Sequence, residues 1–162
     1  MIGLRTAAMV AALALTACGQ SPAPNTPFAE DSDVMTATEP FRDFGAWSVH
    51  VNALLTDQLT AEIASQYGIA RSNSRAMLNV SIVRDQPVDG SSGMRANVSV
   101  SATNLSDQLR NLTMREIVED DAIYYIGETA VTDGETLIFT ISVTPEGEGT
   151  QTIRYMQQFF VD

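Results

Sequence analysis

The sequence predicts an all-β fold, a single antiparallel β-sandwich of about seven strands with one short helix between the first two strands. From Phe44 onward, apolar residues recur at every second position, which is the period of a half-buried strand rather than of a helix. The alternating runs are short and are separated by Gly, Pro and Asp residues typical of turns. The 162 residues with 44% apolar content are enough for one domain with a hydrophobic core.

The first expected strand covers residues 44–53, with Trp47 facing inward and His50 facing solvent. Six more strands are expected at residues 78–83, 96–103, 109–118, 122–131, 137–143 and 152–161. The run at 109–118 is mixed, and the run at 122–131 is rich in β-forming residues on both faces. Strands at this spacing favour a sandwich, and a closed barrel is the alternative arrangement.

The breaks between these strands have the chemistry of turns. Asp133-Gly134 is a standard signal for a two-residue hairpin, and Glu119 to Asp121 is short enough for another. Residues 85–93 and 145–149 are expected to form loops, because each contains proline and glycine.

A short helix is expected at residues 60–67. Thr60 is a suitable N-cap, Glu62 lies in the first turn, and Gly68 fits the position after the C-cap. Ile63 and Tyr67 are four residues apart, so they share one face of the helix. We expect this face to cover one open end of the sandwich.

Residues 1–17 are expected to be a lipoprotein signal peptide. Arg5 provides the positive start, and the apolar run at 7–16 is shorter than the ~20 residues that span a bilayer. The run ends in Leu15-Thr16-Ala17-Cys18, which resembles the bacterial lipobox. The resemblance implies cleavage before Cys18 and its acylation, with palmitate among the attached chains. The alternative is an ordinary secretory signal with an incidental cysteine.

Residues 18–43 are expected to be the lipidated cysteine and a tether, and residues 44–162 the folded domain. Four of the six prolines and several acids lie in residues 18–43, a composition typical of an extended linker. Several acyl chains on Cys18 would hold the protein stably on a membrane. Gly19, rather than aspartate, follows Cys18; by resemblance to the sorting rule of enteric bacteria, this implies the periplasmic side of the outer membrane.

The charge excludes some partners. The chain has 20 acidic and 9 basic residues, so its formal net charge is −11. Nucleic-acid binding requires clustered basic residues, so no nucleic-acid partner is expected. Adsorption to anionic lipid through a basic patch is disfavoured for the same reason.

Residues that could carry catalysis are few. His50 is the only histidine, it is expected to face solvent, and no G-x-S-x-G motif accompanies the serines. With Cys18 lipidated, no thiol remains for catalysis or for a zinc site. We therefore assign no catalytic residue, no metal and no cofactor, and we expect that the chain is not an enzyme.

Acidic turns are weak candidates for a Ca²⁺ site. The candidates are Glu119, Asp120 and Asp121 at one turn and Glu146 and Glu148 at another. They could supply oxygen ligands only if both turns lie at the same end of the sandwich. A hydrolase would need two such carboxylates held in a cleft. The preferred interpretation is that these acids keep exposed turns soluble.

Tyr125 and Phe160 are weak candidates for an interaction surface. Tyr124 and Tyr125 are adjacent in an expected strand, so they point to opposite faces. A surface tyrosine beside arginine is a reasonable interface anchor. Phe160 lies in the last expected strand, which is the first place to look for a partner.

The region from Phe44 to Phe160 resembles a family of proteobacterial envelope proteins, the domain of unknown function numbered 4426. The resemblance rests on Phe44-Gly45, Tyr67-Gly68-Ile69, Arg71-Ser72, Ala102-Thr103-Asn104-Leu105, Arg115-Glu116-Ile117 and Asp121-Ala122-Ile123-Tyr124-Tyr125-Ile126. It implies a single immunoglobulin-like β-sandwich exported to the envelope. It implies no activity and no catalytic residue.

Together these observations predict a non-enzymatic, periplasm-facing outer-membrane lipoprotein whose β-sandwich binds another envelope protein. A sandwich that binds a small ligand or Ca²⁺ through its acidic turns is the alternative, and a hydrolase is a third. The identity of the partner does not follow from the sequence.

Overall fold

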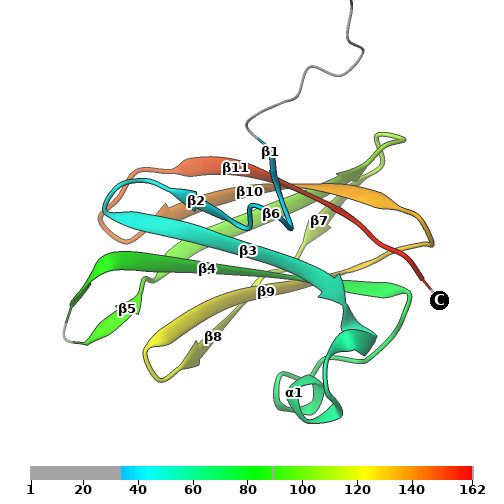
Figure 1. The fold of residues 1–162 in the computed structure, drawn as a ribbon, viewed down its shortest axis with the longest axis horizontal. Coiled ribbons are helices and arrows are strands. Elements are labelled where there is room, and N and C mark those ends of the chain that lie inside the picture. Colours follow the sequence, from blue (N-terminus) through cyan, green and yellow to red (C-terminus); the bar gives the residue numbers. More distant parts are fainter. Residues whose placement is uncertain (1–33, 89, 162) are drawn as a thin grey trace, which may run out of the picture. The chain divides into compact units, whose positions relative to one another are not determined.

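The computed structural model describes residues 34–88 and 90–161, which form two β-sheets packed face to face as a sandwich (Figure 1). The predicted all-β sandwich is confirmed, and the closed barrel is not formed. The expected signal peptide, Cys18 and the tether up to residue 33 lie outside the described residues.

The sheets are named A and B. Sheet A has the order β1 (Val34–Thr36), β11 (Gln151–Gln158), β10 (Thr136–Pro145), β6 (Ala96–Asn104) and β7 (Leu109–Leu112). Sheet B has the order β2 (Phe41–Asp43), β3 (Trp47–Leu55), β4 (Arg75–Val88), β9 (Ala122–Ala130) and β8 (Arg115–Glu119), and β5 (Ser91–Gly93) pairs with β4. Neighbouring strands are antiparallel except β1, which runs parallel to β11.

The core lies between the sheets and follows the predicted alternation. On β3, Trp47, Val49 and Val51 are buried, whereas His50 is exposed. On sheet A, the rings of Phe139 and Tyr155 pack with centroids 6.3 Å apart and are fully buried. The inward positions of the long strands were therefore readable from the sequence.

The structure contains more strands than the expected seven. β1, β2 and β5 are three-residue strands, too short to show an alternating pattern. The mixed run at 109–118 is two strands, because the chain leaves sheet A after Leu112 and enters sheet B at Arg115.

The fold begins before the expected boundary at residue 44. β1 pairs with β11, β2 pairs with β3, and Met35 is buried in the core with 1% of its surface exposed. Residues 34–43 are thus part of the sandwich rather than of a tether. Main-chain hydrogen bonds and one buried side chain hold them there, and neither leaves a clear mark on composition.

The turn at Asp133-Gly134 does not form the expected hairpin. It connects β9 in sheet B to β10 in sheet A, so the strands on either side of it are not paired. Glu135 N–H donates to the Thr132 carbonyl (3.1 Å), and Gly134 adopts a φ of +69°. The dipeptide specifies a tight reversal, but the packing of the two sheets decides where the next strand pairs.

Helix α1 (Ala61–Gln66) follows a 3₁₀ turn (Thr56–Gln58) and has the predicted caps. The Thr60 hydroxyl accepts a hydrogen bond from Ile63 N–H (3.2 Å). Gly68 has a φ of +64°, and Ile69 N–H donates to the Ala64 carbonyl (2.7 Å), which is a Schellman ending. Within the described ranges, no helix is long and apolar enough to cross a membrane.

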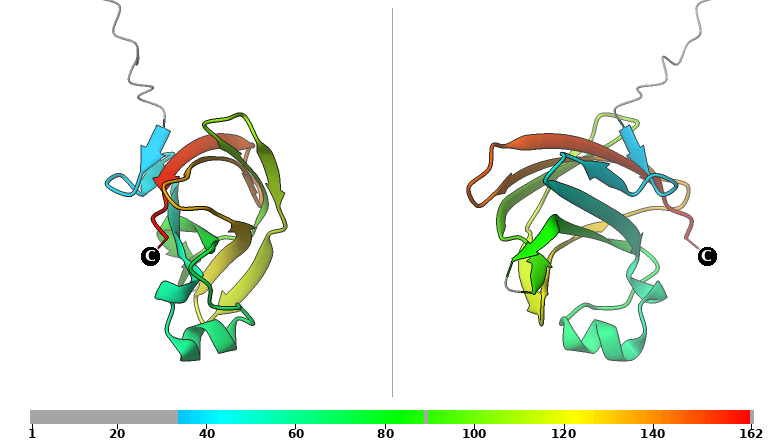
Figure 2. Two further views of the ribbon diagram at one scale, coloured as in Figure 1. Left: turned by 90° about the vertical axis from the view of Figure 1, so that its right-hand side faces the viewer. Right: turned by 60° about the vertical axis from the view of Figure 1, so that its left-hand side comes forward.

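The position of α1 differs from the expected one. Figure 2 shows α1 on the side of β3 and β4 rather than of β10 and β11. Ala64 packs with Met77 and Ile126, and these two residues point away from the inter-sheet core, because their neighbours Leu78 and Tyr125 belong to that core. The helix therefore lies on the outer face of sheet B and does not close an open end.

Candidate functional site

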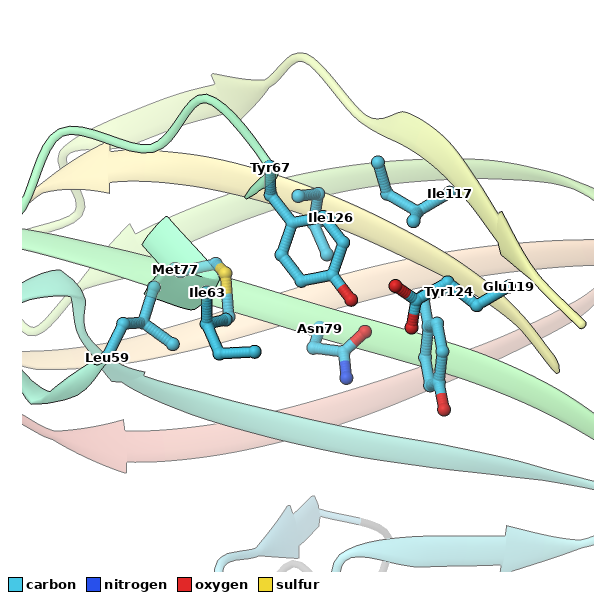
Figure 3. Close-up of a pocket in the computed structure, with 9 residues that line it drawn as sticks. All are labelled: Leu59, Ile63, Tyr67, Met77, Asn79, Ile117, Glu119, Tyr124 and Ile126. Atoms are coloured by element: carbon cyan, nitrogen blue, oxygen red, sulfur yellow. The ribbon is translucent and has the colours of Figure 1, made fainter. Parts of the chain in front are cut away.

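A groove lies between α1 and the outer face of sheet B, and we call it the helix groove. It has a volume of about 270 Å³. Figure 3 shows the nine residues that line it: Leu59, Ile63, Tyr67, Met77, Asn79, Ile117, Glu119, Tyr124 and Ile126. They come from the helix segment and from β4, β8 and β9.

The floor and one wall of the helix groove are apolar. Met77 and Ile126 are buried beneath the helix, and Leu59 and Ile117 are partly buried beside them. Ile63 lines the groove and is 37% exposed. The groove therefore presents apolar surface to whatever enters it.

The opposite side of the helix groove is polar and carries one carboxylate. Gln66 Nε2 donates a hydrogen bond to Glu119 Oε1 (2.7 Å). The hydrogen bond between Tyr67 and Glu119, together with partial burial and the negative charge of Glu119, raises the pKa of Tyr67 to about 12. Figure 3 shows the Tyr67 hydroxyl directed toward the Glu119 carboxylate. Among the ion pairs between described residues, none involves Glu119.

Asn79 places a polar group in the apolar part of the groove. Its Oδ1 atom is buried and has no hydrogen-bond partner among the described residues. A buried acceptor without a partner costs about 1–3 kcal/mol, so such atoms are rare in native structures. A ligand that donates a hydrogen bond to Asn79 would recover this energy.

Helix α1 is held firmly over the sheet. The buried Thr56 hydroxyl donates to the carbonyls of Ala70 (2.9 Å) and Ser72 (3.1 Å) and accepts from Ser72 N–H (2.9 Å). Arg71 Nη2 donates to the Asp57 carbonyl (2.6 Å). These bonds join the two connections on either side of the helix, so the groove is a fixed feature of the fold.

The side chains of the two acidic turns do not come together as a cluster that could hold Ca²⁺. Both turns lie at one end of the sandwich, on the left in Figure 1, but they belong to different sheets. Glu119 faces the helix groove, and Asp120 and Asp121 are exposed at the β8–β9 turn. Glu146 and Glu148 are exposed at the β10–β11 turn. No group of three or more His, Cys, Asp or Glu side chains is placed to hold a metal in the described parts of the chain.

The prediction that Tyr125 belongs to an interaction surface is wrong. Tyr125 is 5% exposed and lies in the core, where its hydroxyl accepts from Ala96 N–H (2.8 Å) and donates to Glu116 Oε2 (3.0 Å). Burial raises its pKa. Its neighbour Tyr124 lies on the outer face of sheet B and lines the helix groove. The alternation indicated opposite faces for the pair but not which face was covered.

Phe160 is exposed and remains a candidate for an interaction surface. It is 65% exposed and lies just beyond β11. It lines a shallow hollow with Leu54 and Gln58, separate from the helix groove. β11 itself is flanked by β10 and, at residues 154–156, by β1, so its edge is partly covered.

His50 is exposed, as expected. Its Nε2 atom lies 3.1 Å from the Ser48 hydroxyl, and its ring stacks on Phe41 with centroids 5.6 Å apart. On sheet B, Arg115 lies 3.7 Å from Glu128, and both side chains remain partly exposed. Such pairs contribute little to stability.

Tyr67, Asn79 and Tyr124 were not among the predicted site residues. One signal pointed toward them: the strand at 122–131 is apolar on both faces, which indicates that its outer face is covered by another element. The amphipathic helix at 60–67 was the only candidate cover. The sequence does not indicate that the helix leaves part of this face of the sheet open.

The described residues therefore place the protein in the class of β-sandwiches that carry one α-helix on the outer face of a sheet. The family model described as "Domain of unknown function (DUF4426)" matches residues 41–162, and the chain belongs to this family. The comparison with curated proteins gives no match. A solved structure of a DUF4426 family protein from Pseudomonas aeruginosa is similar: it is 30% identical and has a TM-score of 0.65. The match covers 75% of this chain and 94% of the other.

Proposed function

We propose that this protein is a non-enzymatic, lipid-anchored envelope protein whose β-sandwich binds another envelope protein through the helix groove. The observation that carries the proposal is the groove itself. It is fixed over sheet B, it exposes Ile63, and no described segment of the chain fills it. A partner side chain that entered the groove would bury this apolar surface.

Photo-cross-linking in cells tests this function. The photoreactive residue p-benzoyl-phenylalanine replaces Ile63 in the full-length protein. In a matched control it replaces Leu105, which is 74% exposed and does not line the groove. We expect one defined cross-linked protein with the probe at position 63 and none at position 105. Equal yields at both positions, or no cross-link at 63, would contradict the proposal.

The anchor is part of the same proposal. The motif Leu15-Thr16-Ala17-Cys18 supports acylation at Cys18, and Gly19 supports the periplasmic side of the outer membrane. Feeding cells an alkyne analogue of palmitate should label the wild-type protein and not Cys18→Ala. Retained label in the variant would place the lipid elsewhere, and an unlabelled wild type would contradict lipidation. Membrane fractionation of the wild type tests the outer-membrane location.

A small-molecule ligand is the second candidate. The unpaired Asn79 Oδ1 in an apolar groove favours it. Calorimetry of the full-length protein with a panel of envelope sugars would detect it. Heat that disappears in an Asn79→Leu variant would favour a small ligand over a protein partner.

A further inference from the structure

We propose that the helix groove binds one basic side chain, an arginine or lysine presented by the partner protein. This inference rests on the proposed function and specifies the chemistry of its contact. It follows from the groups that the groove offers, from its size and from the charge around it.

The groove offers hydrogen-bond acceptors. Asn79 Oδ1 is buried and unpartnered, and the Glu119 carboxylate is not paired with any described basic side chain. A carboxylate has about four acceptor positions, so the donors Gln66 and Tyr67 leave capacity for another donor. An entirely apolar side chain would leave Asn79 without a partner, and an acidic one would be repelled by Glu119.

The rest of the groove suits the long stem of a basic side chain. Lysine and arginine carry a charged head on an aliphatic stem that packs on apolar surface. Met77, Ile126 and Ile63 provide this surface. Tyr67 and Tyr124 both line the groove, and aromatic rings near a cation add attraction.

The groove is large enough for one long side chain. Its volume of about 270 Å³ lies at the small end of the ~300–1,000 Å³ range of typical ligand pockets. A second hollow shares Asn79 and is lined by Pro40, His50 and Ser81. The main chain of a partner could cross this second hollow while one side chain enters the groove.

Charge complementarity supports a basic partner. The net charge of the chain is −11, which would draw a basic protein toward it. Two arginines lie on the same outer face, and both are paired with Glu128: Arg75 at 3.6 Å and Arg115 at 3.7 Å. Arg115 also donates to the Tyr67 carbonyl (3.0 Å). Glu128 does not line the groove, so these pairs leave Glu119 as the carboxylate available to a ligand.

The test compares two capped peptides of nearly equal size, one with a charged guanidinium head and one with a neutral ureido head. Acetyl-Gly-Arg-Gly-amide and its neutral citrulline analogue are titrated into the detergent-solubilised full-length protein, and amide NMR shifts are followed at Tyr67, Asn79 and Tyr124. We expect saturable shifts at these residues and binding of the arginine peptide at least about threefold tighter than of the citrulline peptide. Glu119→Gln should abolish this preference. The control Glu62→Gln removes the same charge from an exposed helix position outside the groove and should retain it.

Three results would overturn the inference: equal binding of the two peptides, an unchanged preference in Glu119→Gln, or shifts confined to residues outside the groove. The cross-link at position 63 separates this inference from the proposed function. If a partner cross-links at position 63 but the arginine peptide is not preferred, the proposed function is supported and the inference of a basic side chain is wrong. An arginine preference without a cross-linked partner would overturn the assignment to a partner protein and indicate a free amine or guanidine ligand.

Discussion

Gln66 Nε2, in the last turn of α1, donates a hydrogen bond of 2.7 Å to Oε1 of Glu119 at the end of β8, 53 positions later in the chain. This bond ties the helix to an edge strand of sheet B. Tyr67, the next residue after Gln66, directs its hydroxyl toward the same carboxylate, which raises the pKa of Tyr67. The carboxylate therefore both fixes the polar side of the helix groove and faces whatever binds there.

The first prediction concerns the titration of Tyr67. Its folded-state pKa of about 12 lies above the ordinary value of 10.0, so its protonated form adds stability that is fully present below pH 10 and lost as the pH rises toward 12. Glu119→Gln should lower the pKa of Tyr67 toward 10, because the hydrogen bond to a carboxylate is lost. The ¹³Cζ chemical shift of Tyr67 measures this. Glu62→Gln is the control and should leave the titration unchanged; an equal shift in both variants would contradict the assignment.

The second prediction concerns Asn79. Replacement by leucine removes a buried unpartnered acceptor and fills part of the groove, so Asn79→Leu should raise the free energy of unfolding by about 1 kcal/mol. The same variant should lose binding of the arginine peptide. Urea denaturation measures the stability. Asn97→Leu, at an exposed position of β6, is the control and should change it by less than about 0.5 kcal/mol. A destabilised Asn79→Leu would show that the amide is satisfied in solution.

The third prediction concerns Glu135, which joins the β9–β10 connection to sheet A. Its side chain is 7% exposed and accepts from Arg110 Nη2 (2.6 Å), Asn104 Nδ2 (3.0 Å) and Thr132 N–H (3.0 Å). Burial alone would raise the pKa of Glu135, but these hydrogen bonds and the Arg110 charge outweigh it and hold the pKa below 4.5. Glu135→Gln should lower the free energy of unfolding at pH 7 by about 2 kcal/mol.

The pH dependence of this effect has a definite sign. Because the folded-state pKa of Glu135 is depressed, its contribution is present above pH 4.5 and is lost as the pH falls through the folded-state value. The difference between wild type and Glu135→Gln should therefore shrink in acid. Urea titrations at pH 7 and at about pH 3 measure it, with the exposed Glu148→Gln as control. A difference that is independent of pH would contradict this account.

The fourth prediction tests where the fold begins. Met35 is 1% exposed and packs in the core between the sheets. Met35→Ala should lower the free energy of unfolding by about 3 kcal/mol, because removal of the buried methionine side chain leaves a cavity in the core. The control Thr38→Ala changes an exposed turn residue and should have little effect. Thermal unfolding of the two full-length variants measures this effect. Equal melting temperatures for Met35→Ala and Thr38→Ala would indicate that residues 34–43 belong to the tether.

Features that depend on neighbouring residues follow directly from the amino-acid sequence. The inward positions of β3, β4, β6 and β10 follow from alternation with a period of two, because adjacent side chains on a strand point to opposite faces. Both caps of α1 follow from Thr60 and Gly68, because capping bonds join residues a few positions apart. The family resemblance was readable from the same local runs.

Which elements meet depends on packing between distant parts of the chain. The tertiary structure placed β9 and β10 in different sheets on either side of Asp133-Gly134, divided residues 109–118 between sheets, and recruited Met35 to the core. It also put α1 on the outer face of sheet B, where Tyr124 rather than Tyr125 borders the groove. Periodicity indicates which side of a strand is covered only where one face is apolar and the other polar. The covering partner is selected by hydrogen bonds and packing between residues far apart in the chain, and these leave no local pattern.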